Sequence, residues 1–60
     1  MCEIIEEIRE YCLEVIRMYD GTYHIVVDKS NVNKVENMLK DGGAELHFNY
    51  GENIHIDVKF

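Results

Sequence analysis

The chain has 60 residues, with twelve acidic side chains against six basic ones, a formal net charge of −6, and no proline or tryptophan. A chain of this length buries only about 60% of the surface that its unfolded form exposes, so we expect a small core and no large enclosed substrate cavity. No repeat, low-complexity tract or linker interrupts the sequence, which predicts a single domain over residues 1–60.

The apolar fraction of 47% is ordinary for a globular protein and too high for a disordered acidic tail. No uninterrupted apolar run exceeds three residues, so the sequence predicts no membrane span and no signal peptide, and a cytoplasmic location by default. The two cysteines, Cys2 and Cys12, fall in one predicted helix about 15 Å apart. Because that separation exceeds the reach of a disulfide, we expect free thiols.

The first predicted element is an amphipathic helix over residues 2–19. Its apolar side chains recur at spacings of three and four residues, which is the pattern of one buried helix face: Ile5, Ile8, Cys12, Val15 and Tyr19. Five glutamates fall on the opposite arc: Glu3, Glu6, Glu7, Glu10 and Glu14. We expect this helix to end at Asp20-Gly21, since glycine accepts the left-handed conformation that terminates helices.

A strand and a second helix follow. Residues 22–28 are rich in β-branched and aromatic side chains, with Tyr23, Ile25 and Val27 on one face. Asp28 or Ser30 is the expected cap of a helix that ends at Gly42-Gly43. Its inward side carries Val32, Val35, Met38 and Leu39.

Two further strands, residues 44–50 and 53–60, form a hairpin whose register follows from parity. Opposite residues of an antiparallel pair must point to the same face, which rejects a two-residue loop. A loop of Gly51-Glu52-Asn53 pairs Tyr50 with Ile54, Phe48 with Ile56 and Leu46 with Val58. It also pairs, on the other face, Asn49 with His55, His47 with Asp57 and Glu45 with Lys59. A register shifted by two residues also keeps both faces consistent, but it places Glu45 opposite Asp57, and two like charges in opposite positions repel. We therefore prefer the register with the Gly51-Glu52-Asn53 loop.

These elements predict an α+β fold, a two-layer sandwich in the order helix, strand, helix, strand, strand. The two helices are expected to share the apolar face of a three-stranded sheet. The crossover rule allows the strand order 1-3-2, which we prefer, or the alternative 1-2-3. Ile8 and Ile56 are both assigned to the interior between helix and sheet.

The outer face of this sheet carries all three histidines. A solvated polar face is one interpretation, and a transition-metal site of a ligand-binding homo-oligomer is the alternative, using His24, His47, His55 and Asp57. These residues follow none of the established metal-ligand spacings, so the primary prediction is no metal and no cofactor. Neither Ser30 nor the cysteines are placed to form a nucleophilic triad with a histidine, and we expect no enzymatic activity.

The charge distribution is more informative than any motif. Residues 1–20 hold six acids and two arginines, and they carry most of the net negative charge. Basic side chains are scattered and outnumbered, which argues against direct binding of DNA or RNA. An acidic protein with rows of carboxylates can instead occupy the basic groove of a nucleic-acid-handling protein. In size and charge the chain is similar to the small acidic inhibitors that phages direct against host defence nucleases.

The sequence therefore predicts a small acidic, non-enzymatic binding protein with a basic protein partner. The expected contact residues are the five helix glutamates with Asp20 and Glu52 at the rim. A homo-oligomer is also expected, because a small core and an unpaired sheet edge favour self-association. Val26 is the one apolar residue of the outer face, which favours either sheet-face or edge pairing near residues 22–28.

Overall fold

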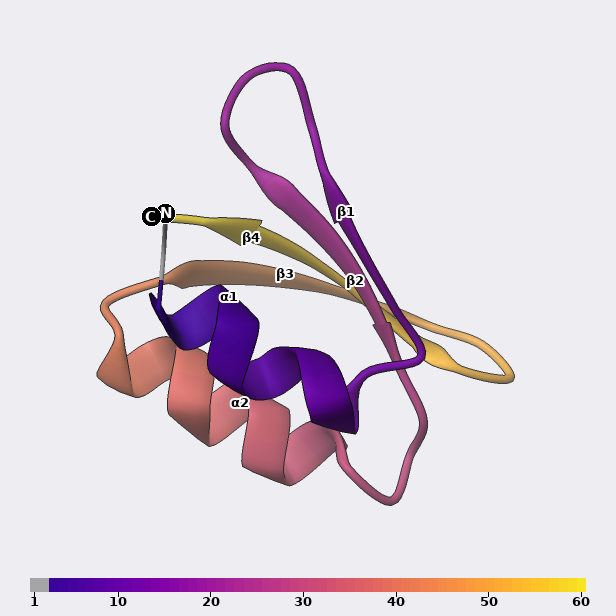
Figure 1. Ribbon diagram of the computed structural model, residues 1–60. Helices are drawn as coiled ribbons and strands as arrows, with labels where there is room; N and C mark the ends of the chain where they lie inside the picture. Colours follow the sequence, from indigo (N-terminus) through magenta and orange to yellow (C-terminus); the bar gives the residue numbers. More distant parts are fainter. Residues whose placement is uncertain (1–2) are drawn as a thin grey trace.

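The computed structural model describes residues 3–60. The elements follow in the order α1 (Glu3–Ile8), the 3₁₀ helix η1 (Arg9–Tyr11), β1 (Glu14–Arg17), β2 (Tyr23–Val27), α2 (Val32–Asp41), β3 (Glu45–Tyr50) and β4 (Ile54–Lys59). The strands form one antiparallel sheet in the order β1-β2-β4-β3. Both helices lie on one side of this sheet (Figure 1). The α+β class agrees with the sequence prediction, but the sheet has four strands rather than three.

The additional strand comes from the second half of the segment that we expected to be helical. The prediction of a helix over residues 2–19 is wrong beyond Tyr11, and its first residue, Cys2, lies outside the described residues. From Glu14 the chain is extended and pairs with β2, so that Val15 lies opposite Ile25.

Two physical reasons favour a strand here. Val15 and Ile16 are β-branched, and β2 would otherwise expose a row of unpaired backbone N–H and C=O groups along one edge. Asp20-Gly21, which we expected to end a helix, instead forms the turn of the β1–β2 hairpin. Gly21 has a φ of 87°, a conformation that side-chain-bearing residues avoid. Tyr19, predicted to face inward, is fully exposed beside this turn.

The β3–β4 hairpin has the predicted register. Tyr50 lies opposite Ile54, Phe48 opposite Ile56, and the remaining four pairs also agree. β4 lies between β2 and β3, so the three strands expected from the sequence adopt the preferred arrangement and not the alternative 1-2-3. The rule that opposite residues point to the same face identified this register, because one face of both strands packs against the core and a slip by one residue would mix the two faces.

The start of α2 differs from the expectation. Its N-cap is Asn31, which makes no side-chain capping bond, so neither Asp28 nor Ser30 is the cap. Instead the Asp28 carboxylate accepts hydrogen bonds from the Asn31 N–H (3.1 Å) and the Ser30 hydroxyl (2.7 Å), which closes the turn before the helix. The helix ends at Gly42, as expected, and Gly43 has a φ of 82°.

The core lies between the helices and the sheet. Among residues 3–60 the buried side chains are Ile5, Ile8, Ile25, Val27, Val35, Leu39, Ile54, Ile56 and Val58. Ile8 and Ile56 have no exposed surface, which confirms their assignment to the interior. Neither helix within residues 3–60 has the length and apolarity needed to cross a bilayer.

Candidate functional site

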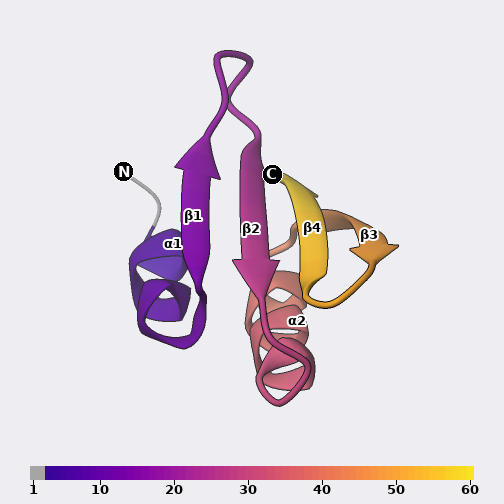
Figure 2. The ribbon, with the colours of Figure 1, turned by 90° about the vertical axis from the view of Figure 1, so that its right-hand side faces the viewer.

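The sheet face opposite the helices is open and mostly polar. In an antiparallel pair, opposite residues point to the same face, so the observed registers place one alternating set of side chains there. The members of this open face are Glu14, Ile16, His24, Val26, Glu45, His47, Asn49, His55, Asp57 and Lys59. Figure 2 shows the strands in front of both helices, with this face toward the viewer. All three histidines share it, as the alternation predicted.

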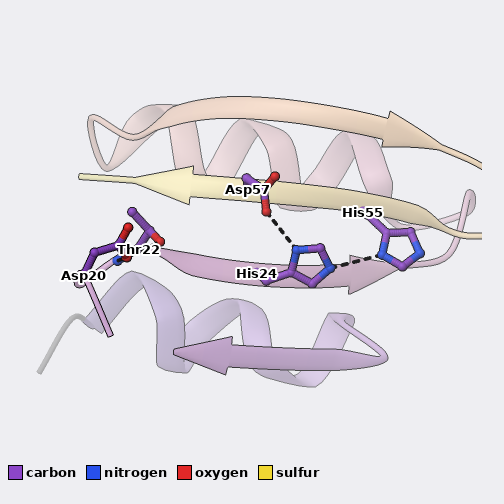
Figure 3. A network of polar contacts seen from close by, with 5 residues as sticks. All are labelled: Asp20, Thr22, His24, His55 and Asp57. Atoms are coloured by element: carbon purple, nitrogen blue, oxygen red, sulfur yellow. Dashed lines mark hydrogen bonds and ion pairs between the residues drawn. The ribbon is translucent and has the colours of Figure 1, made fainter. Parts of the chain in front are cut away.

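Three side chains of the open face form a hydrogen-bonded chain that joins β2 and β4. His24 Nδ1 lies 2.8 Å from Asp57 Oδ1, and His24 Nε2 lies 3.1 Å from His55 Nδ1 (Figure 3). The ring centroids of His24 and His55 are 5.3 Å apart, with 45° between the ring planes. We call this arrangement the histidine chain.

The sheet register creates the histidine chain. His24 is directly opposite Asp57, while His55 is opposite Val26 and therefore lies diagonally across from His24. Such a diagonal separation is within the reach of aromatic side chains. Strand alternation predicted the common face of these residues, but the contact between His24 and His55 depends on the β2–β4 register.

Within residues 3–60, His47 makes no hydrogen bond to a member of the histidine chain. It lies opposite Asp57 on β3, on the far side of β4 from His24. In the described part of the chain, no three side chains among His, Cys, Asp and Glu gather closely enough to hold a metal ion. The alternative set of His24, His47, His55 and Asp57 therefore does not converge as a single group of ligands.

The candidate nucleophiles lie on other elements. The Ser30 hydroxyl donates its hydrogen bond to Asp28 in the turn before α2. Cys12 is half-buried at the end of η1, and burial raises the pKa of its thiol from 9.0 to about 11, against a smaller opposing effect of the Arg9 charge. A thiol with this pKa is almost fully protonated at neutral pH and is a poor nucleophile.

A second surface is defined by the four glutamates of α1 and η1, and we call it the acidic surface. Glu3, Glu6, Glu7 and Glu10 are all exposed. Within residues 3–60 the only ion pair among them joins Glu6 to Arg9, at 3.6 Å between two half-exposed side chains. An exposed pair of this kind contributes little to stability. The acidic surface is therefore a concentration of carboxylates that the fold does not neutralise.

The structure does not bring together the other three predicted contact residues. Glu14 lies on β1 and points to the open face, whereas α1 covers the opposite face, so the predicted row of five glutamates is interrupted. Asp20 lies in the β1–β2 turn and Glu52 in the β3–β4 turn. Because the start of β4 pairs with the end of β2, these two turns are at opposite ends of the sheet.

Asp20 has a local structural role in its turn. The hydroxyl and the N–H of Thr22 donate to its carboxylate at 2.6 and 3.0 Å (Figure 3). These bonds, led by that from the hydroxyl, lower the pKa of the Asp20 carboxyl below 3.8. Its charge is therefore retained at any pH near neutral, and it fixes the conformation of the hairpin turn.

Sequence reasoning missed a group of exposed apolar side chains on β1, its turn and the residue before the strand: Leu13, Ile16, Met18 and Tyr19. They were assigned to a helix and so were not considered as a surface. The preferred pairing region, residues 22–28, is also wrong as an edge, because β2 lies between β1 and β4. The free edges of the sheet belong to β1 and β3.

Comparison with known proteins finds no matching family model, no matching curated protein and no matching solved structure.

Proposed function

We propose that this protein is a non-enzymatic binding protein whose acidic surface contacts a basic, nucleic-acid-handling protein partner in the cytoplasm. The observation that carries the proposal is the acidic surface itself. It presents four exposed glutamates within eight residues, and three of them make no ion pair within residues 3–60.

Exposed charges of one sign that have no partner within the protein act mainly on the rate at which it meets another protein. Complementary potentials between two proteins raise the rate of association and orient the partners, and this contribution falls as salt increases. The same charges contribute little to folding, because water solvates them in both states. A surface of this kind therefore fits the role of a modulator or inhibitor that competes for a basic groove.

The basic side chains support a protein partner rather than a nucleic acid. Three of the six are engaged locally: Arg9 pairs with Glu6 at 3.6 Å, Lys40 pairs with Glu36 at 2.7 Å, and Lys34 lies 4.2 Å from the centre of the Tyr11 ring. The six cations are distributed over helices, strands and turns instead of forming one stripe. Affinity for a polyanion requires such a concentration of cations.

We further infer that the protein self-associates through the free edge of β1. Ile16 on β1 is 40% exposed and Leu13, the residue before the strand, is 59% exposed. No proline or lysine within the strand protects it from pairing with another one. The net charge of −6 opposes association at low ionic strength, so self-association is expected to strengthen as salt increases.

Charge reversal tests the acidic surface. The double variant Glu7→Lys and Glu10→Lys is compared with a matched control, Asp41→Lys and Glu45→Lys, which changes the net charge equally on other exposed elements. Each protein is used for affinity purification from the cells that produce it, at low and high salt, and equal melting temperatures confirm that both variants fold. We expect basic proteins that bind the parent and the control at low salt and are lost with the first variant.

Equal capture of the same proteins by both double variants would contradict the proposal. Capture that is independent of salt would contradict it as well, because screening must weaken an interaction that depends on exposed charges.

A further inference from the structure

The histidine chain has the geometry of a two-ligand metal site. His24 presents Nε2 and His55 presents Nδ1 toward each other, and these nitrogen atoms are 3.1 Å apart. Two imidazole nitrogens bound to one tetrahedral Zn²⁺, each at about 2.0–2.1 Å, lie roughly 3.3 Å apart. A metal ion can therefore take the place of the proton between the two rings after the side chains rotate, and this proton of His55 Nδ1 is then carried on His55 Nε2 by exchange with water.

Asp57 supplies the second part of the geometry. Its Oδ1 accepts a hydrogen bond from His24 Nδ1 at 2.8 Å, which fixes the tautomer that leaves a lone pair on His24 Nε2. Metal-binding histidines usually donate their other ring N–H to a carboxylate or carbonyl in this way, and that bond orients the ring and raises its basicity. The carboxylate is thus placed to position His24.

We propose that His24 Nε2 and His55 Nδ1 bind a divalent first-row transition-metal ion, with Zn²⁺ as the representative ion. Imidazole nitrogen is a preferred ligand of zinc, copper and nickel ions. Water completes the coordination on the open face, where His24 and Asp57 both retain solvent exposure. This site is independent of the acidic surface and of the partner proposed for it.

The sheet makes the two ligands rigid relative to each other. β2 and β4 are hydrogen-bonded neighbours, and the diagonal position of His24 and His55 follows from their register. His47 lies diagonally across from His55 on the neighbouring strand β3, but β4 separates it from His24 by roughly 9.6 Å at the usual strand spacing. Within residues 3–60 no third side chain of a ligand type gathers with the two rings closely enough to share an ion with them. The protein thus contributes two ligands, and His47 provides a matched control on the same face.

Zn²⁺ titration of the ¹⁵N-labelled chain, followed in long-range ¹H–¹⁵N spectra, identifies the coordinating nitrogens directly. We expect the resonances of His24 Nε2 and His55 Nδ1 to shift together at one equivalent of Zn²⁺, while both ring nitrogens of His47 stay unchanged. An exposed histidine that binds zinc by chance does so through the accessible Nε2. Binding at Nδ1 leaves the ring proton of His55 on Nε2, so both of its ring resonances change. A His55 that binds zinc through Nε2 and keeps its proton on Nδ1, or no ring shift at all, would overturn the assignment.

Calorimetry of variants measures the contribution of each residue. The background is Cys2→Ser with Cys12→Ala, since thiolates also bind zinc. We expect His24→Ala and His55→Ala each to weaken Zn²⁺ binding by about tenfold or more, and Asp57→Asn by about tenfold. His47→Ala is expected to stay within about twofold.

Unchanged Zn²⁺ affinity in His24→Ala or His55→Ala would overturn the proposal, as would an equal loss in His47→Ala. If an alanine variant does not fold, the ring-nitrogen spectra of the parent chain decide the question alone. A stoichiometry of one ion per two chains, with the same two nitrogens shifted, supports the site and identifies a second copy as the source of the remaining ligands.

Discussion

Truncation of two isoleucines on opposite sides of the sheet tests the correction to the predicted fold most directly. Ile56 on β4 is completely buried, and it lies opposite Ile25 on one side and Phe48 on the other. Ile16 on β1 is 40% exposed on the open face. We compare Ile56→Ala with Ile16→Ala, because the two substitutions remove the same atoms from different surroundings.

The expected costs follow from burial. Each substitution removes three carbon groups, and at about 0.8 kcal/mol for each buried group the transfer cost at Ile56 is about 2.4 kcal/mol. The unfilled cavity raises this cost toward about 5 kcal/mol where neighbours do not relax. A 60-residue protein has a free energy of unfolding of roughly 3–9 kcal/mol, so Ile56→Ala removes a large part of it. At the exposed position we expect a cost below about 1 kcal/mol.

Thermal and urea unfolding followed by circular dichroism measures both costs. A change of 1 kcal/mol shifts the melting temperature of so small a domain by about 4–8 °C, so Ile56→Ala is expected to melt at least about 10 °C below the parent. Melting of Ile56→Ala within two degrees of the parent would refute its assignment to the core. A loss of unfolding free energy in Ile16→Ala as large as that in Ile56→Ala would refute the placement of residues 14–17 on an exposed edge strand.

Three further predictions concern single groups. In a Cys2→Ser variant, alkylation of Cys12 at pH 8 is expected to be about a hundredfold slower than that of a thiol with a pKa of 9.0. The reason is that a pKa of about 11 leaves about a hundredfold less thiolate. Alkylation of Cys12 at the rate of a free thiol would contradict its burial. NMR titration should give the Asp20 carboxyl a midpoint below 3.8, and Thr22→Val should raise it. Because the pKa of Asp20 is lower in the folded than in the unfolded state, its carboxylate stabilises the fold at any pH above the unfolded-state pKa. This stabilisation is lost as the pH falls through the folded-state pKa. Sedimentation at millimolar concentration should show a dimer that Ile16→Lys converts to a 7.1 kDa monomer, whereas a monomeric parent would reject pairing at β1.

Local sequence determined the parts of the fold in which one face of an element is strongly apolar. The β3–β4 register followed from parity, because a slip by one residue would expose Phe48 and Ile56 together. The helix around Val35 and Leu39 followed from its apolar spacing and from the glycines that end it. The shared face of the three histidines followed from alternation alone.

Tertiary structure decided between a helix and a strand for residues 12–19. Their apolar spacing fits a helix face, yet the β-branched Val15 and Ile16 also suit a strand, so local preference did not choose between them. The choice depended on the unpaired edge of β2, whose backbone groups gain partners only when residues 14–17 are extended. The contact between His24 and His55 has the same origin: alternation placed both rings on one face, but only the register of two strands distant in sequence brought their nitrogens within 3.1 Å.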